Sequence, residues 1–234
     1  MEKTCVIPSR FSVRKAHLAQ ICLSKKIITE DRLPQRIRLV AGVDVAYADD
    51  LAVSAVAVLD YGSLELVESQ TAACKVRFPY VPTLLSFREL PAAVACIRKL
   101  KTQPDVFLAD GQGIAHPHGC GFASHLGLAI GKPTVGVAKS RLVGEPTEIH
   151  GRMFLVHGGK TVGAVLTTKK GAKPVYVSVG HLVSLDTAIR IVEHCSRRGR
   201  IPEPLSSAHM IASEKKRETL CTSSGNSESK MGCL

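Results

Sequence analysis

Residues 38–60 decide the fold, and they read RLVAGVDVAYADDLAVSAVAVLD. Two runs rich in Val and Ala, 38–47 and 51–60, are separated by a pair of aspartates, which are typical turn residues. A third run of strand-forming residues, 64–76, follows after another short turn. Connections this short predict an antiparallel meander of three strands, because a parallel return needs a crossover of about a dozen residues.

Helices and buried strands alternate around this meander. Apolar residues recur at helical spacing over 11–30, and a helix over 84–100 is expected to be split by Pro91. The other expected helices are 121–130, 184–198 and 204–217, and the other expected strands are 105–110, 133–137, 152–157, 161–168 and 174–179. This order predicts a three-layer α/β/α domain with a mixed sheet, in which parallel strands extend the meander and helices cover both faces.

All of these elements are expected to form one domain, residues 1–217. No internal repeat and no Pro/Ser-rich linker interrupts the chain before residue 218. Residues 218–234 are rich in Ser and Gly with scattered charge, so we predict a disordered C-terminal tail there.

The 234-residue chain is strongly basic, with 31 Lys and Arg against 20 Asp and Glu and a formal net charge of +11. A hydrophobic content of 45% excludes global disorder. Six Phe, four Tyr and no Trp are too few for a surface that binds nucleic acid mainly by stacking bases. The charge favours a nucleic-acid partner, because a basic surface gains affinity by releasing counterions from phosphates. The alternative is a charge that serves solubility alone.

The sequence carries no recognisable targeting or membrane segment. Pro8, Ser9 and Arg10 follow the first apolar residues, so no h-region of about 7–15 apolar residues forms. No apolar run approaches the ~20 residues that span a bilayer. None of the eight cysteines belongs to a Cys-x-x-Cys pair, which argues against a zinc ribbon. We therefore expect a soluble, cytoplasmic protein with free thiols and no membrane contact.

Three acidic residues are the most informative side chains. Asp44 lies inside the apolar run 39–46, where a carboxylate is costly unless it is paired or holds a metal ion. Asp110 ends an apolar strand, the place where open α/β sheets bind ligands. Glu89 lies on the connection between these two strands. Each has a structural alternative: a salt bridge for Asp44, a turn or helix N-cap for Asp110, and a capping box with Ser86 for Glu89.

Taken together, the three acids predict a metal site. Their two strands are natural neighbours in such a sheet, so the carboxylates can converge. A carboxylate cluster without a cysteine pair selects hard cations such as magnesium or manganese. In a basic chain, the chemistry that fits is metal-assisted hydrolysis of a phosphodiester.

Two segments between the acids are suited to binding a base. The loop that contains Gly111 and Gly113 is neither a Walker loop nor a dinucleotide fingerprint, and its glycines would allow a flat ligand to approach the backbone. Tyr80 lies between Pro79 and Pro82, which hold the chain rigid. This segment is either an extended connector or an aromatic wedge that fills the gap left by a flipped base.

The histidines give a weaker signal. The pair His116 and His118, together with His125, could suggest zinc, but the intervening proline and the loop favour surface histidines. His209 lies in the last expected helix and is more typical of a helix-face histidine than of a catalytic group.

Several contiguous motifs nevertheless resemble the endonuclease V family, the deoxyinosine 3′ endonucleases of the ribonuclease H-like superfamily. The resemblance covers roughly residues 10–217. It rests on residues 40–45 (VAGVDV), 78–82 (FPYVP), 85–89 (LSFRE), 104–113 (PDVFLADGQG), 116–117 (HP), 123–127 (ASHLG), 133–142 (PTVGVAKSRL), 180–181 (GH) and 200–204 (RIPEP). One departure is visible at Thr83, where the family usually has Gly.

The resemblance implies a role for each matching residue. Asp44 and Asp110 would bind magnesium, with manganese as a substitute, and Glu89 would be the third catalytic carboxylate and metal ligand. Lys139 and His209 would complete the catalytic site. Tyr80 would be the wedge, flanked by Pro79 and Pro82, and the pocket for the flipped base would be lined by Gly111, Gly113, His116, Gly121 and Gly136.

The implied activity is an endodeoxyribonuclease of DNA repair. It would cut the second phosphodiester bond 3′ to deoxyinosine and leave 3′-hydroxyl and 5′-phosphate ends, acting as a monomer. Cleavage of inosine-containing RNA is the alternative within the same enzyme class. A non-catalytic binder of deaminated nucleic acid would not need all three carboxylates, and a junction resolvase on the same fold would not need the glycine loop or Tyr80.

Overall fold

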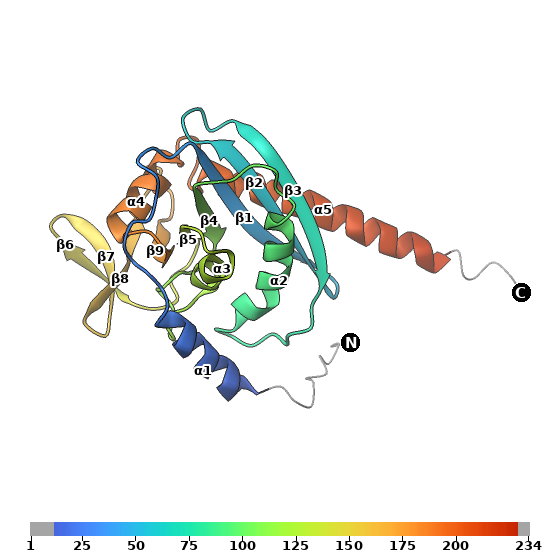
Figure 1. Cartoon of the computed structure of the whole chain (residues 1–234), viewed down its shortest axis with the longest axis horizontal. Coiled ribbons are helices and arrows are strands. Elements are labelled where there is room, and N and C mark those ends of the chain that lie inside the picture. The colour runs from blue at the N-terminus through green and yellow to red at the C-terminus, as the bar shows by residue number, and fades with distance from the viewer. Residues whose placement is uncertain (1–11, 229–234) are drawn as a thin grey trace, which may run out of the picture.

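The computed structural model describes residues 12–228, with side chains as far as Cys221, and shows a central sheet between helices (Figure 1). Its helices are α1 (Val13–Ser24), α2 (Leu85–Ile97), α3 (Phe122–Ile130), α4 (Leu185–His194) and α5 (Glu203–Glu228). Its strands are β1 (Leu39–Ala48), β2 (Leu51–Asp60), β3 (Leu66–Lys75), β4 (Val106–Asp110), β5 (Thr134–Ala138), β6 (Glu145–Ile149), β7 (Arg152–His157), β8 (Lys160–Leu166) and β9 (Val175–His181). Across the described residues, no helix is both long and apolar enough to span a membrane.

The sheet has the strand order β3-β2-β1-β4-β5-β9-β8-β7-β6. The predicted meander is confirmed, because β1 pairs antiparallel with β2, and β2 pairs antiparallel with β3. Strand β4 lies parallel to the other side of β1, and β5 lies parallel to β4. The sheet is therefore mixed, as the sequence predicts.

Helices cover both faces of the sheet, which confirms the three-layer α/β/α class. Alternate residues of β1 show the division, because successive side chains of a strand point to opposite faces. Ala41 and Val43 belong to a buried cluster with residues of α2 and α3, such as Cys96. Val40 belongs to the opposite cluster, which includes Leu205 of α5 and residues of α4.

Helix α5 packs directly onto β1 at Gly42. A Cβ atom at this position would lie 2.0 Å from the carbonyl oxygen of Pro204, so no side chain larger than hydrogen fits. This close approach brings the first turns of α5 against the strand that carries Asp44. The glycine thereby positions one part of the candidate site.

Three sequence expectations need correction. Helix α2 is continuous through Pro91, because the buried face formed by Ala92, Ala93 and Cys96 outweighs the one backbone hydrogen bond that proline cannot donate. Ser86 is inside α2 and the N-cap residue Leu84 makes no side-chain cap, so the capping box does not form.

The third correction concerns the C-terminus. Helix α5 does not end at residue 217 but continues to Glu228, into the segment expected to be disordered. An ion pair between Lys215 and Glu218 and a hydrogen bond from the Thr219 hydroxyl to the Lys215 carbonyl support the added turns. Residues 229–234 of the expected tail lie outside the described residues.

Candidate active site

Asp44 and Asp110 lie side by side on the sheet. The parallel register pairs Val43 of β1 with Ala109 of β4, so the next residue on each strand is an aspartate. Strand β1 continues past this point, whereas β4 ends at Asp110. The predicted convergence of these two strands is confirmed, and Asp44 is 8% exposed.

Glu89 approaches the pair from α2. It is 7% exposed, and its Oε1 accepts a hydrogen bond of 3.3 Å from the Tyr47 hydroxyl. Burial, followed by the charges of Asp44 and Asp110, raises the pKa of Glu89 to about 8. Three carboxyl groups therefore share one small region, where they cannot all ionise without cost.

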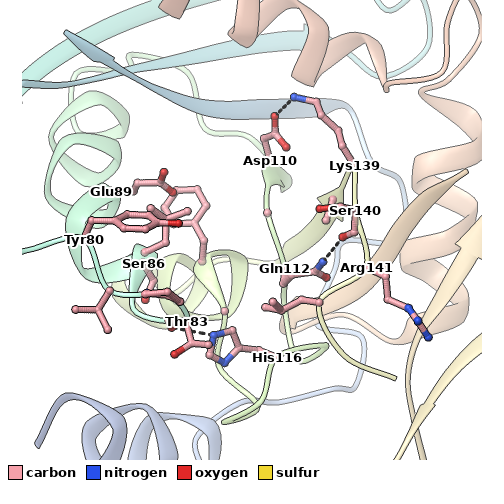
Figure 2. A pocket seen from close by; sticks show the side chains of 18 residues that line it. Tyr80, Thr83, Ser86, Glu89, Asp110, Gln112, His116, Lys139, Ser140 and Arg141 are labelled. Atoms are coloured by element: carbon pink, nitrogen blue, oxygen red, sulfur yellow. Dashed lines mark hydrogen bonds and ion pairs between the residues drawn. The ribbon is translucent and has the colours of Figure 1, made fainter. Parts of the chain in front are cut away.

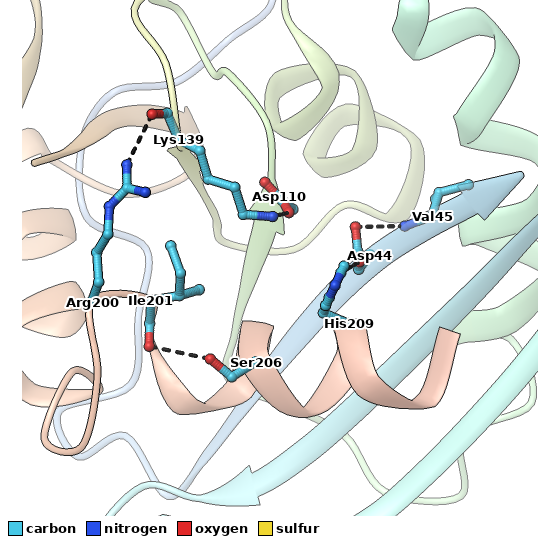
Figure 3. A network of polar contacts seen from close by, with 8 residues as sticks. All are labelled: Asp44, Val45, Asp110, Lys139, Arg200, Ile201, Ser206 and His209. Atoms are coloured by element: carbon cyan, nitrogen blue, oxygen red, sulfur yellow. Dashed lines mark hydrogen bonds and ion pairs between the residues drawn. The ribbon is translucent and has the colours of Figure 1, made fainter. Parts of the chain in front are cut away.

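Two basic residues, Lys139 and His209, face the aspartates (Figure 3). Lys139, which follows β5, forms an ion pair with Asp110, and Nδ1 of His209 on α5 lies 2.7 Å from Oδ2 of Asp44. Burial raises the pKa of Asp110, while the hydrogen bond and charge of Lys139 oppose that rise. All five residues that the sequence nominated for catalysis thus meet in one place.

The donor set fits a hard divalent cation. The carboxylates offer only oxygen ligands, and their mutual repulsion is what a bound cation would relieve. As they stand, no three His, Cys, Asp or Glu side chains of residues 12–221 form a ready ligand set. Asp44 is instead in contact with His209, and Asp110 is paired with Lys139, whose ammonium lies where a metal ion's charge would act.

A cavity of about 510 Å³ opens beside the acids (Figure 2). Glu89, Asp110 and Lys139 line it together with Tyr80, Gly111 and other residues of the same segments. The full lining is Tyr80–Thr83, Leu85, Ser86, Glu89, Asp110–Gln112, His116, Gly121, Phe122 and Ala138–Leu142. One continuous hollow therefore joins the candidate catalytic groups to the candidate base pocket.

The expected pocket glycines divide into two groups. Gly111 and Gly121 line the cavity, whereas Gly113 and Gly136 do not. A Cβ at Gly113 would lie 2.0 Å from the Val179 carbonyl oxygen, and one at Gly136 would lie 2.5 Å from the backbone nitrogen of Gly113. These two glycines let backbone pack against backbone behind the cavity, rather than letting a ligand approach.

His116 contributes to the cavity as a neutral group. It is 5% exposed, its Nε2 donates to the Thr83 carbonyl at 2.9 Å, and its Nδ1 accepts from the His118 backbone N–H at 3.2 Å. These two contacts place the single ring proton on Nε2. Burial lowers the pKa of His116 to about 4, so it stays uncharged at neutral pH. The surface position that the sequence favoured for this residue is therefore wrong.

Tyr80 stands at the rim, 69% exposed, where an aromatic ring can reach a bound partner. Its flanking prolines differ, since Pro79 is buried and Pro82 is exposed and lines the cavity. Thr83 ends the segment with a left-handed φ of 71°, unfavourable for a β-branched residue. It is held there by α1, because the Gln20 amide donates to its carbonyl at 2.8 Å.

Sequence reasoning assigned no supporting contact to the side chains of Gln20, Arg200 and Gln112. Gln20 is fully buried and also donates to the Cys120 carbonyl at 3.1 Å, so it ties two cavity walls together. Arg200 donates to the Lys139 carbonyl at 2.9 Å, and Gln112 donates to the Ser140 carbonyl at the same distance. Gln20 is a polar residue at a core-facing position of an amphipathic helix. This was the one sequence signal that could have indicated a supporting role.

Comparisons with known proteins agree on one family. The family model described as Endonuclease V matches residues 21–210. The Endonuclease V of Thermofilum pendens is 45% identical over 208 residues, covering 88% of this chain and 90% of that protein. That of Nostoc punctiforme is 46% identical over 210 residues, covering 87% and 95%.

Solved structures give the same answer. The Endonuclease V of Streptomyces avermitilis superposes with a TM-score of 0.81 at 39% identity, covering 89% of this chain and 94% of that one. The Endonuclease V of Ciona intestinalis, in complex with a 24mer DNA containing an inosine followed by a ribo-adenosine, superposes with a TM-score of 0.79 at 30% identity. That match covers 88% of this chain and 98% of the other.

Proposed function

Because the chain belongs to the endonuclease V family and is therefore a nuclease, we propose that it recognises deoxyinosine in DNA and cuts beside it. The proposed cut is at the second phosphodiester bond 3′ to the lesion, with 3′-hydroxyl and 5′-phosphate ends and magnesium as the cofactor. The observation that carries the proposal is the shared cavity, in which Glu89 and Asp110 lie beside Tyr80, Gly111 and His116. A base held in this cavity keeps its strand next to the acids.

Asp44 and Asp110, with Glu89, are the residues that would hold the magnesium ion, for which manganese can substitute. The ion supplies stabilisation of the negative charge that develops on the phosphate and lowers the pKa of water. The pKa of Glu89, about 8 in the metal-free protein, lets this residue hold a proton near neutral pH and release it when positive charge arrives.

Lys139 and His209 carry the remaining chemistry in this proposal. The Lys139 ammonium lies at Asp110 and would donate to a phosphate oxygen, which favours the crowded charge of the transition state. The His209 side chain is 60% exposed while its Nδ1 is held by Asp44, so its other nitrogen faces outward. That nitrogen can move a proton to or from the oxygen atoms of the cut bond.

Base selection belongs to the other half of the cavity. Tyr80 at the rim would fill the gap in the duplex while the flipped base enters beside Gly111 and Gly121. His116 is neutral and holds the backbone of Thr83, so it shapes the wall without adding charge. This uncharged part of the wall suits hypoxanthine, which is itself uncharged.

Nicking assays test the proposal directly. Purified protein with magnesium should nick a duplex that contains one deoxyinosine and should spare the matching undamaged duplex. With Asp110→Ala, nicking should disappear while binding to the inosine duplex in calcium persists. Equal cutting of both duplexes would contradict inosine recognition, and nicking by Asp110→Ala would contradict the assignment of the site.

Inosine-containing RNA is a second candidate substrate. The Ciona intestinalis complexes contain DNA with an inosine followed by a ribo-adenosine, so a relative accommodates a ribonucleotide directly beyond the inosine. Three matched duplexes distinguish the candidates: deoxyinosine in DNA, inosine followed by one ribonucleotide, and inosine in RNA. Faster cleavage of the second and third would favour the endoribonuclease.

A further inference from the structure

Helix α5 continues past the candidate catalytic histidine as a long arm that leaves the body of the protein (Figure 1). Just beyond His209 lies a shallow hollow lined by His209, Met210, Ser213, Glu214, Lys216 and Arg217. We propose that this face of α5 binds the phosphate backbone of the cleaved strand on the 3′ side of the cut. The inference rests on the proposed function and extends its substrate contacts beyond the cavity.

Spacing places Lys216 in line with the site. Residues 209, 213 and 216 follow one another at intervals of four and three, which puts them on one face of a helix. Lys216 lies seven residues beyond His209, or about 10 Å along the axis at 1.5 Å per residue. A DNA strand rises about 3.4 Å per nucleotide along the duplex axis, so a strand that runs along α5 would meet Lys216 roughly three nucleotides past the cut.

The charges on this face are free to bind an anion. Lys215 forms an ion pair with Glu218 at 2.9 Å, but over residues 12–221 no ion pair or hydrogen bond engages the side chain of Lys216 or Arg217. Arg217 is exposed and Lys216 half-buried. Glu214 also lines the hollow, and its negative charge would repel an anion there. Removal of this charge should therefore strengthen anion binding, whereas removal of the basic charges should weaken it.

The direction of the bound strand follows from the order of the base cavity, the acids and the α5 hollow. The base cavity and the α5 hollow share no lining residue, and the contact between His209 and Asp44 links the hollow to the acids. The cut lies 3′ to the base that is held in the cavity. The strand therefore runs from this base, in the 3′ direction, to the acids. The segment that reaches α5 is therefore the 3′ segment.

Binding measurements on substrates of two lengths test this inference. One inosine substrate ends one nucleotide 3′ of the cut and the other ends ten nucleotides beyond it, and both are titrated with full-length protein in calcium at several salt concentrations. The double variant Lys216→Ala/Arg217→Ala should lose most of the extra affinity for the long substrate, on the order of tenfold at low salt. The slope of log K against log salt should fall by about 1.4 to 1.8, and binding to the short substrate should not change.

Two single variants make the result specific. Lys215→Ala, which removes a neighbouring charge already paired with Glu218, should leave both affinities unchanged. Glu214→Gln should tighten binding to the long substrate only. Thermal unfolding of each variant confirms that the helix remains folded.

The outcomes separate the two proposals. Unchanged long-substrate binding in the double variant, or equal losses on both lengths, would overturn the inference, the latter by placing the contact 5′ to the cut or on the complementary strand. Wild-type protein that neither binds nor nicks inosine DNA would overturn the proposed function instead. Selective loss on the long substrate with inosine nicking retained would support both.

Discussion

Around the base cavity, backbone packs against backbone and the buried His116 is neutral. The neighbouring acid cluster, in contrast, is crowded with charge. Gly113 and Gly136 leave no room for a Cβ, and His116 has a pKa of about 4. Across the same hollow, Glu89 has a pKa of about 8, and Asp110 is held by Lys139. The cavity wall needs no bound group to give it shape, whereas the acids of the cluster repel one another and are contacted by Lys139 and His209.

The difference indicates a division between recognition and chemistry. Recognition of one base among many requires a fixed shape, which close backbone packing supplies. Chemistry on a phosphate requires carboxylates that repel one another until a cation is bound, which makes the acid cluster the less stable part of the site. Four predictions separate the two regions, from the largest effect to the smallest.

Substitution within the acid cluster should abolish activity but not folding. Asp110→Asn removes one of the charges that raise the pKa of Glu89, so nicking should fall by roughly a thousandfold or more while thermal stability is unchanged or higher. Asp50→Asn removes an exposed carboxylate paired with Lys75 and is the matched control. A loss of thermal stability in Asp110→Asn would mean that the cluster supports the fold.

Substitution in the wall of the base cavity should instead destabilise the fold. In Gly136→Ala the new Cβ would lie 2.5 Å from the Gly113 nitrogen and 2.7 Å from the Gly111 carbonyl oxygen. Denaturant unfolding should show a loss of about 3 kcal/mol in the free energy of unfolding, with weaker inosine binding. Gly199→Ala, whose Cβ meets nothing closer than 3.9 Å, should be nearly neutral, and similar losses in both variants would argue against the packing explanation.

Acid should weaken the wall through His116. The folded pKa of about 4 lies below the value of 6.5 for a free imidazole, so the unfolded chain binds more protons between these limits. The free energy of unfolding should therefore fall as the pH drops from 6.5 to 4, by about 3 kcal/mol for this group. His116→Gln should flatten that part of the curve, and an unaltered curve would show that His116 does not cause the slope.

The acid cluster should respond to pH with the opposite sign. Because the folded pKa of Glu89, about 8, exceeds its usual 4.5, the folded state binds more protons and stability falls as the pH rises through this window. Magnesium should offset that loss, so its stabilising effect should be larger at pH 8 than at pH 5 by on the order of 1–2 kcal/mol. Thermal unfolding with and without magnesium measures it, and Asp110→Asn should show little difference between the two pH values.

Local patterns in the sequence predicted most of the fold. The short turns of the meander and the apolar run before Asp110 indicated strands whose pairing the register confirms. Strand β6 was missed because its side chains are almost all exposed and it includes Pro146, so it has neither apolar alternation nor typical composition. The continuity of α2 through Pro91 depends on packing that no local pattern reveals.

The site was predictable by residue type but not by contact. Buried carboxylates and glycines can be read from their neighbours, and the five nominated catalytic residues do meet. The partners of Thr83 could not be predicted, because Gln20 and His116 reach its carbonyl from segments distant in sequence. The roles of Gly113 and Gly136 were likewise hidden, since a glycine that admits a ligand and one that admits another strand look alike in sequence.

The contact between α5 and Gly42 has a consequence for biosynthesis. Chains are made from the N-terminus, and domains tend to fold as their parts emerge. Asp44, Glu89 and Asp110 all precede residue 111, whereas the helix that fits over Gly42 and carries His209 begins only at Glu203. A growing chain therefore carries its three acids before α5 has been made, and the site gains His209 only after that helix has been synthesised.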